Sequence, residues 1–237
     1  MERAGRRRTA VLVLVEALGL LLVFAVFTRL HAAAGQDVAS ATVHARTVQA
    51  VERALGLDIE RPVNAWLSGH PALIRLAVVV YRTYYLAVLG VLVWVAVRHA
   101  EVYRPVRRAL VAMLVLILPV YWALPVSPPR FALAGIVDIV AEHDIGGRHG
   151  GGNLYSAMPS LHVGLSAWCA YAVWLALHRS HPRLSLLAWL FPLLMASVVL
   201  TTGNHYVLDV VGAAVLLGAA VGVATLWGRL IALASPR

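Results

Sequence analysis

The chain has 237 residues, of which 61% are hydrophobic and 13% are charged, and its mean hydropathy is +0.79. A water-soluble domain carries about 25% charged residues, so this composition excludes a soluble globular protein and a disordered chain. The single cysteine, Cys169, excludes a scaffold held by intrachain disulfides. Because Leu, Val and Ala form long uninterrupted runs, we predict an all-α, polytopic membrane protein with one domain over residues 1–237.

Six segments approach the roughly 20 apolar residues with which a helix crosses the hydrocarbon core of a bilayer. They predict a bundle of six transmembrane helices, at residues 10–30, 73–97, 107–126, 160–178, 184–202 and 206–228. The fifth span contains Pro192, which predicts a kink. Residues 1–34 contain the first span or an uncleaved signal anchor, and the alternative is a signal peptide cleaved after three consecutive alanines, residues 32–34.

The positions of the arginines predict the orientation of the chain. All 20 basic residues are arginine, and most precede the first span, fill the second and fourth loops or follow the sixth span. Short cytoplasmic loops retain positive charge, so we expect both termini to be cytoplasmic. Loops 31–72 and 127–159 then face outward, from what we expect to be a bacterial cell membrane.

The first outer loop contains an amphipathic segment. Its apolar positions share one helical face, while Arg46, Glu52 and Arg53 lie elsewhere, and those apolar positions are Val43, Thr47, Val48, Val51 and Leu55. This pattern is typical of a helix that lies in the membrane interface. The helix serves as a lid or a spacer, and gating of substrate entry is the alternative.

Polar residues gather at the outer ends of the fourth and sixth spans, where buried polar groups indicate function. Pro159 suits the first position of a helix, which makes Met158 the cap residue. Backbone N–H groups of Ser160 and Leu161 would then point at an anion such as phosphate, because the start of a helix attracts negative charge. His162 lies in the same first turn.

His205 and Asp209 are four residues apart, a spacing that brings two side chains together on one face of a helix. A carboxylate that bonds one imidazole nitrogen leaves the other nitrogen as a nucleophile or base. His162 on another helix would complete a nucleophile and acid pair. Arg130 follows a proline-rich segment at the end of the third span, where its guanidinium can grip phosphate oxygens.

These residues resemble a known family. The segments Met158-Pro159-Ser160-Leu161-His162 and His205-Tyr206-Val207-Leu208-Asp209 are similar to two signature blocks of the type 2 phosphatidic acid phosphatase superfamily, over about residues 70–228. The residues of these two blocks look more like those of the branch that includes inositol phosphorylceramide synthase. The resemblance implies that His205 attacks phosphorus and becomes a phosphohistidine, that Asp209 orients His205, and that His162 protonates the leaving group. It also implies that Ser160 and Arg130 hold phosphate oxygens, with no metal and no cofactor.

Two positively charged residues of the usual family pattern are missing. The chain contains no lysine, and Val199 stands where the family places an arginine six residues before the nucleophilic histidine. Arg82, about ten residues into the second span, is the candidate replacement because a charge at that depth needs a partner or a wet cavity. Arg148 and Asn153 are weaker candidates.

We therefore expect a membrane enzyme that takes a phosphoryl group or phospho-headgroup from a lipid phosphate or phospholipid donor and transfers it to a hydroxyl acceptor such as inositol or another polyol. Hydrolysis of a phosphatidate or polyprenyl phosphate is the alternative within the same chemistry. A transporter and an inactive scaffold are the alternatives of another class. We expect a membrane environment and no nucleic-acid partner.

Overall fold

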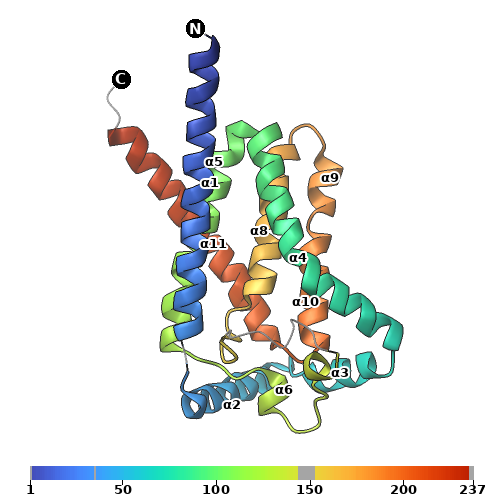
Figure 1. The fold of residues 1–237 in the computed structure, drawn as a ribbon. Helices are drawn as coiled ribbons and strands as arrows, with labels where there is room; N and C mark the ends of the chain where they lie inside the picture. Colours follow the sequence, from blue (N-terminus) through green and yellow to red (C-terminus); the bar gives the residue numbers. More distant parts are fainter. Residues whose placement is uncertain (1, 35, 144–152, 235–237) are drawn as a thin grey trace.

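The computed structural model describes residues 2–34, 36–143 and 153–234. In this part of the chain the regular elements are all helices (Figure 1), so the predicted all-α class is confirmed. The longer helices are α1 (Glu2–Ala33), α2 (Val38–Leu55), α4 (Pro71–Arg98), α5 (Ala100–Ala123), α8 (Leu161–Leu177), α10 (Leu190–Thr201) and α11 (Val207–Ala234). The shorter ones are α3 (Glu60–Ser68), α6 (Pro129–Ala132), α7 (Ile139–Glu142) and α9 (Pro182–Leu187).

The apolar helices identify an integral membrane protein. Among the described residues, five segments are long and apolar enough to cross a bilayer, namely Leu14–Ala33, Pro71–Arg98, Ala100–Ala123, Pro182–Thr201 and Val207–Ala234. The predicted fourth span corresponds to α8, which has only 17 residues. Helix α8 packs against α4, α5, α10 and α11 in the centre of the bundle. The count of six spans therefore stays a prediction.

The fifth predicted span is interrupted rather than kinked at its proline. Helix α9 ends at Leu187, α10 begins at Leu190, and Pro192 is the third residue of α10. A proline in the first turn of a helix removes an N–H group that has no partner within the helix in any case. Pro192 is therefore compatible with the first turn of α10, and the interruption lies before it, between Leu187 and Leu190.

The two ends of the bundle differ in their loops. Figure 1 shows the start of α1, the end of α11 and the α4–α5 and α8–α9 connections at one end, and α2, α3 and α6 at the other. The arginine-rich connections thus share one end of the bundle, as the alternation of the predicted spans requires. Which end faces the cytoplasm stays a prediction.

Helix α2 in the first outer loop forms as predicted, but its buried face is not the one that the apolar pattern indicated. Val43, Val51 and Leu55 are exposed. The side that packs inward shares only Val48 with the predicted apolar face, and its buried residues are Ala41, Ala45, Val48, Gln49 and Glu52. The helix therefore supports the end of the bundle with this side and leaves its apolar residues free to face lipid.

Asn64 of α3 joins three segments at this end of the molecule. Its side chain is fully buried; its Nδ2 donates to the carbonyl groups of Val137 and Thr201, and its Oδ1 accepts from the N–H of Val137. A buried amide with its hydrogen bonds satisfied fixes the groups around it. The first outer loop therefore positions both the third loop and the end of α10.

Gly203 connects α10 to the segment that precedes α11. Its φ is +70°, a conformation that favours glycine, and its carbonyl accepts a hydrogen bond from the backbone N–H of Arg130 at 2.9 Å. A Cβ at this position would lie 2.8 Å from Cγ2 of Ile136. Glycine is required here by both the backbone conformation and the space available.

We predict that Gly203→Ala lowers the free energy of unfolding by more than the roughly 1–2 kcal/mol that a left-handed conformation costs an alanine. Gly56→Ala is the matched control, because Gly56 has a φ of +68° and no atom within 4 Å of the added Cβ. Thermal unfolding of both variants in detergent measures the difference. Equal losses of stability would show that the contact with Ile136 costs nothing.

Candidate active site

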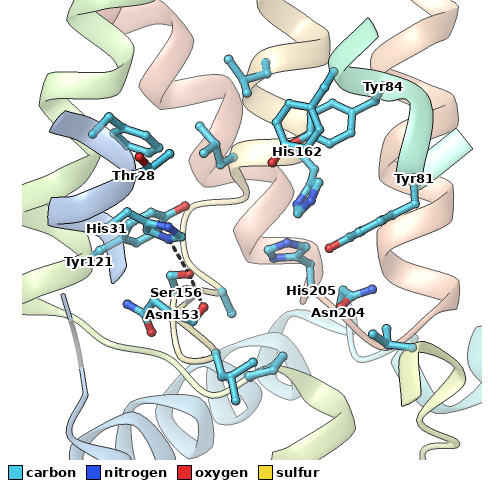
Figure 2. A pocket seen from close by; sticks show the side chains of 18 of the residues that line it. Thr28, His31, Tyr81, Tyr84, Tyr121, Asn153, Ser156, His162, Asn204 and His205 are labelled. Carbon is cyan, nitrogen blue, oxygen red and sulfur yellow. Dashed lines mark hydrogen bonds between the residues drawn. The ribbon is translucent and has the colours of Figure 1, made fainter. Parts of the chain in front are cut away.

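A cavity of about 380 Å³ lies at the end of the bundle that carries α2 and α6. Its walls come from α1, α4, α5 and α8, from the third loop (127–159) and from the segment between α10 and α11. Arg130, His162 and His205, which the sequence assigned to one site, all line it. Figure 2 shows His162 and His205 close together on one side of the cavity.

The two imidazoles come from different segments and face each other. The ring centroids of His162 and His205 are 5.9 Å apart, and the ring planes make an angle of 62°. The ring of His162 packs against Tyr81 at 4.4 Å and Tyr84 at 5.0 Å, both on α4. This aromatic packing fixes the position of His162 opposite His205.

Asp209 contacts His205 as the spacing predicted, but through a different local structure. His205 precedes α11, and Asp209 is the third residue of that helix. The Oδ2 atom of Asp209 lies 3.1 Å from Nδ1 of His205 and accepts the backbone N–H of Tyr206 at 2.8 Å. The contact therefore comes from a side chain that reaches back to cap the helix, rather than from two residues on one helical face.

Two further carboxylates complete this cap. Glu52 of α2 accepts the N–H of Leu208 at 2.7 Å, and Glu60 of α3 accepts the N–H of Val207 at 3.4 Å. Both side chains are almost fully buried. The first N–H groups of a helix have no partner within it, and negative charge is favourable at this end. The first outer loop therefore holds the start of α11, next to His205.

Glu52 carries a proton at neutral pH. Burial raises the pKa of Glu52 to about 8; the hydrogen bond from the Leu208 N–H opposes this shift, and the neighbouring Glu60 and Asp209 add to it. A proton on Glu52 removes the repulsion between two adjacent carboxylates. The cap of α11 thus keeps all of its hydrogen-bond acceptors but carries less negative charge than it would if Glu52, Glu60 and Asp209 were all ionised.

His205 is neutral in the loop between α10 and α11. Burial lowers the pKa of His205 to about 3, a hydrogen bond to the Ala157 carbonyl opposes this shift, and the positive charge of Arg130 adds to it. A neutral imidazole keeps a lone pair on one nitrogen. Since Nδ1 faces Asp209, this arrangement suits Nε2 as the nucleophilic atom.

Arg130 supplies positive charge to the cavity. Its side chain is only 10% exposed, and its Nε lies 3.8 Å from Oδ1 of Asp138, beyond hydrogen-bond distance. Among the described residues, this buried Nε has no hydrogen-bond partner. Burial lowers the pKa of Arg130, while Tyr81 and Asp138 oppose this shift, and a guanidinium stays charged in proteins. An anion in the cavity would satisfy this group.

The start of α8 differs from the prediction. The helix begins at Leu161, and Ser160 is its cap residue, with Oγ accepting the N–H of Val163 at 3.4 Å. The N–H of Ser160 donates to the Asp209 carbonyl, and the carbonyl of Pro159 accepts from Tyr121. The assignment of Met158 as cap and Pro159 as first helical residue was wrong, because a serine hydroxyl satisfies the helix start two residues later. Ser160 is buried and does not line the cavity.

Arg82 also lies away from the cavity. Its side chain is exposed, and it is absent from the cavity wall although Tyr81, Tyr84 and Tyr85 belong to that wall. The structure thus does not place Arg82 where a replacement for the missing family cations is needed. Asn153 does line the cavity, and Arg148 lies outside the described residues.

Sequence reasoning missed several residues at this site. Glu52 and Glu60 are acids in an outer loop, and only the small-residue face of α2 signals that Glu52 is buried. His31, which lies at the end of α1, also lines the cavity and is not among the site residues predicted from the sequence. No sequence pattern indicates that His31 lies near His162 and His205, because α1 meets the rest of the site only in the folded bundle.

Comparison with known proteins identifies the family. The sequence model of the PAP2 superfamily matches residues 46–223, and the chain belongs to this superfamily. No curated protein and no solved structure matches the chain. Members of the PAP2 superfamily are generally phosphatases or phosphotransferases, and this match supports an enzyme with lipid-phosphate chemistry. The match includes Arg130, His162, His205 and Asp209, and it leaves out all of α1 and the first turns of α2.

We predict that Glu52→Ala lowers kcat with little change in KM, because the Leu208 N–H loses its acceptor, at a cost of about 1–3 kcal/mol, and the turn with His205 loosens. Glu52→Gln keeps an acceptor oxygen and retains most of the turnover. Activity of both variants on a lipid phosphate, beside Glu101→Gln at the opposite end of the bundle, measures this effect. Similar kcat values for the Ala and Gln variants at position 52 would contradict the capping role.

The raised pKa of Glu52 predicts that the stability of the protein depends on pH. Folded Glu52 holds its proton up to about pH 8, whereas an unfolded glutamate releases it near pH 4.3, at about the reference value. The folded state therefore binds the extra proton between these values, and stability falls as the pH rises through this range. Thermal unfolding should show a smaller decline for Glu52→Gln than for the wild type; parallel curves would argue against a protonated Glu52.

Proposed function

We propose that the protein transfers a phosphoryl group or phospho-headgroup from a lipid-linked donor to a hydroxyl acceptor, with His205 as the nucleophile. The observation that supports this most strongly is the meeting of two imidazoles and the buried Arg130 guanidinium in one cavity at the end of an apolar bundle. Membership of the PAP2 superfamily supports lipid phosphate as the substrate class. The donor lipid would keep its acyl chains in the bilayer and bring its phosphate to the cavity.

In the first step, Nε2 of His205 attacks phosphorus and forms a P–N bond. The bond between phosphorus and the lipid oxygen breaks, and a protonated His162 gives its proton to that oxygen. The negative charge of a bound phosphate favours the protonated form of His162. Asp209, 3.1 Å from Nδ1 of His205, stabilises the positive charge that develops on this ring, as the carboxylate of a catalytic triad does.

In the second step, the acceptor oxygen attacks the phosphorus of the phosphohistidine. The P–N bond breaks and restores His205, while His162, now neutral, takes the proton of the acceptor hydroxyl. Arg130 stabilises the charge on the phosphoryl oxygens in both steps, because fixed donors in a water-poor site act strongly on such charge. Each cycle returns both histidines to their starting states.

The arginine distribution supports a site on the extracytoplasmic side. The arginine-rich connections lie at the end of the bundle opposite the cavity (Figure 1). Because positively charged loops stay in the cytoplasm, both termini are assigned to the cytoplasmic side and the cavity to the outer leaflet of a bacterial cell membrane.

Hydrolysis of a lipid phosphate uses the same intermediate and is the second candidate. Water replaces the alcohol in the second step, and free phosphate is the product. The PAP2 match supports both reactions equally. The products formed with and without inositol or glycerol distinguish them: a phosphorylated alcohol indicates transfer, and free phosphate alone would defeat the transferase assignment.

We predict that His205→Ala reduces release of phosphate from labelled phosphatidate to the background rate, because this variant lacks the proposed nucleophile. His162→Ala should lower kcat by about 10²–10⁴-fold, the usual contribution of a general acid and base. His181→Ala, an exposed histidine outside the cavity, is the control. Wild-type turnover by His205→Ala, with the protein folded and membrane-inserted, would exclude the proposed mechanism.

A further inference from the structure

Helix α1 forms one wall of the cavity although it lies outside the residues that match the family. Phe24, Phe27, Thr28 and His31 line the cavity, and the match begins only at residue 46. The helix is anchored at both ends of this wall: Glu16 pairs with Arg107 of α5, and the carbonyl of Ala34 accepts Nδ2 of Asn153 at 2.6 Å. The wall is therefore a fixed part of the site.

The hydrogen bonds around His31 define which of its nitrogens carries the proton. The Oγ of Ser156 donates to the carbonyl of Asn153 at 3.1 Å, which uses its only proton. Ser156 must then accept at its 3.0 Å contact with Nε2 of His31. The neutral His31 ring thus carries its proton on Nε2, and its Nδ1 keeps a lone pair. Among the described residues, no hydrogen-bond partner is found for Nδ1.

The ring of His31 is held rigidly. It stacks on Phe27 with centroids 5.6 Å apart and nearly parallel planes, and it packs against Tyr121 at 5.1 Å. Figure 2 shows His31 and Ser156 on the side of the cavity opposite His162 and His205. The ring of His31 therefore has a fixed position across the cavity from the reacting groups.

The size and lining of the cavity restrict what can lie between these walls. Its volume of about 380 Å³ is many times the roughly 30 Å³ share of one water molecule in the liquid, so it has room for more than a phosphoryl group and a water. No carboxylate is among the described residues that line it. An amine acceptor would meet the positive charge of Arg130 without a compensating acid, whereas a neutral hydroxyl group suits the Nδ1 lone pair.

We propose that His31, oriented by Ser156, is a specificity-determining residue that binds a second hydroxyl group of a polyol acceptor. One hydroxyl of the polyol reacts with the phosphohistidine next to His162, and another donates a hydrogen bond to Nδ1 of His31. This inference rests on the proposed phosphotransfer through His205 and adds a preference for acceptors with more than one hydroxyl over simple alcohols and water.

The test compares glycerol with propanol as acceptors for the full-length, detergent-solubilised protein and a labelled phosphatidate donor. Both alcohols react with the same phosphohistidine. The ratio of glycerol phosphate to propyl phosphate therefore measures the preference of the enzyme for one acceptor over the other. We expect His31→Phe, which keeps an aromatic ring and removes both nitrogens, to lower this ratio about tenfold, the factor that corresponds to one hydrogen bond of about 1.4 kcal/mol. His31→Gln, which has both a donor and an acceptor, should recover part of the ratio.

His181→Phe is the matched control, because it makes the same change at an exposed histidine away from the cavity, and we expect the wild-type ratio for it. An unchanged ratio in His31→Phe would overturn the inference. Release of free phosphate by the wild type without transfer to glycerol would also overturn it, while leaving the phosphohistidine mechanism intact.

A second measurement does not depend on turnover. In nitrogen NMR of isotope-labelled histidine, the signal that disappears in His31→Phe belongs to His31, and its unprotonated Nδ1 should shift on addition of glycerol together with inorganic phosphate. If the wild type turned over no lipid phosphate, the proposed function would fail. The shift would still show whether a polyol binds next to Nδ1 of His31. The absence of a shift would reject the subsite.

Discussion

The start of helix α11 is the constraint on which the site depends. A helix that begins inside a protein leaves N–H groups without partners, and leaving them buried is costly. Here the N–H groups of Tyr206, Val207 and Leu208 bond to Asp209, Glu60 and Glu52, acids from three different helices. The same Asp209 oxygen that caps the helix also faces Nδ1 of His205. Helix capping and orientation of the proposed nucleophile are thus one interaction.

This arrangement gives the first outer loop a role that its position in the sequence does not indicate. Through Glu52, Glu60 and Asn64 it contacts the segments before and after the proposed nucleophile, as well as the third loop that carries Arg130. The exposed Val43, Val51 and Leu55 of α2 meanwhile suit contact with lipid. With this exposed side against lipid, α2 would connect the membrane surface to the cap of α11 next to His205.

The sequence predicted the residues that local patterns specify and missed those that depend on distant contacts. The runs of apolar residues predicted the long helices, and the spacing of His205 and Asp209 predicted their contact, although the local structure around it differs. The cap of α8 was misplaced by two residues because Pro159 and Ser160 both suit a helix start, and only the surrounding hydrogen bonds favour the serine. Glu52 and Glu60 lie about 150 residues before the groups that they cap, and His31 meets Ser156 across 125 residues. Contacts of this kind could not be predicted from the sequence, because the residues meet only in the folded bundle.

The central claim is that phosphorus becomes bonded to His205 during turnover. The most direct measurement is rapid quenching of the purified protein with radiolabelled phosphatidate under alkaline conditions, where phosphohistidine is stable, followed by peptide mapping. The account predicts an acid-labile label on the peptide that contains His205, and loss of that label in His205→Ala. A label on another residue, or turnover with no labelled protein at any quench time, would contradict it.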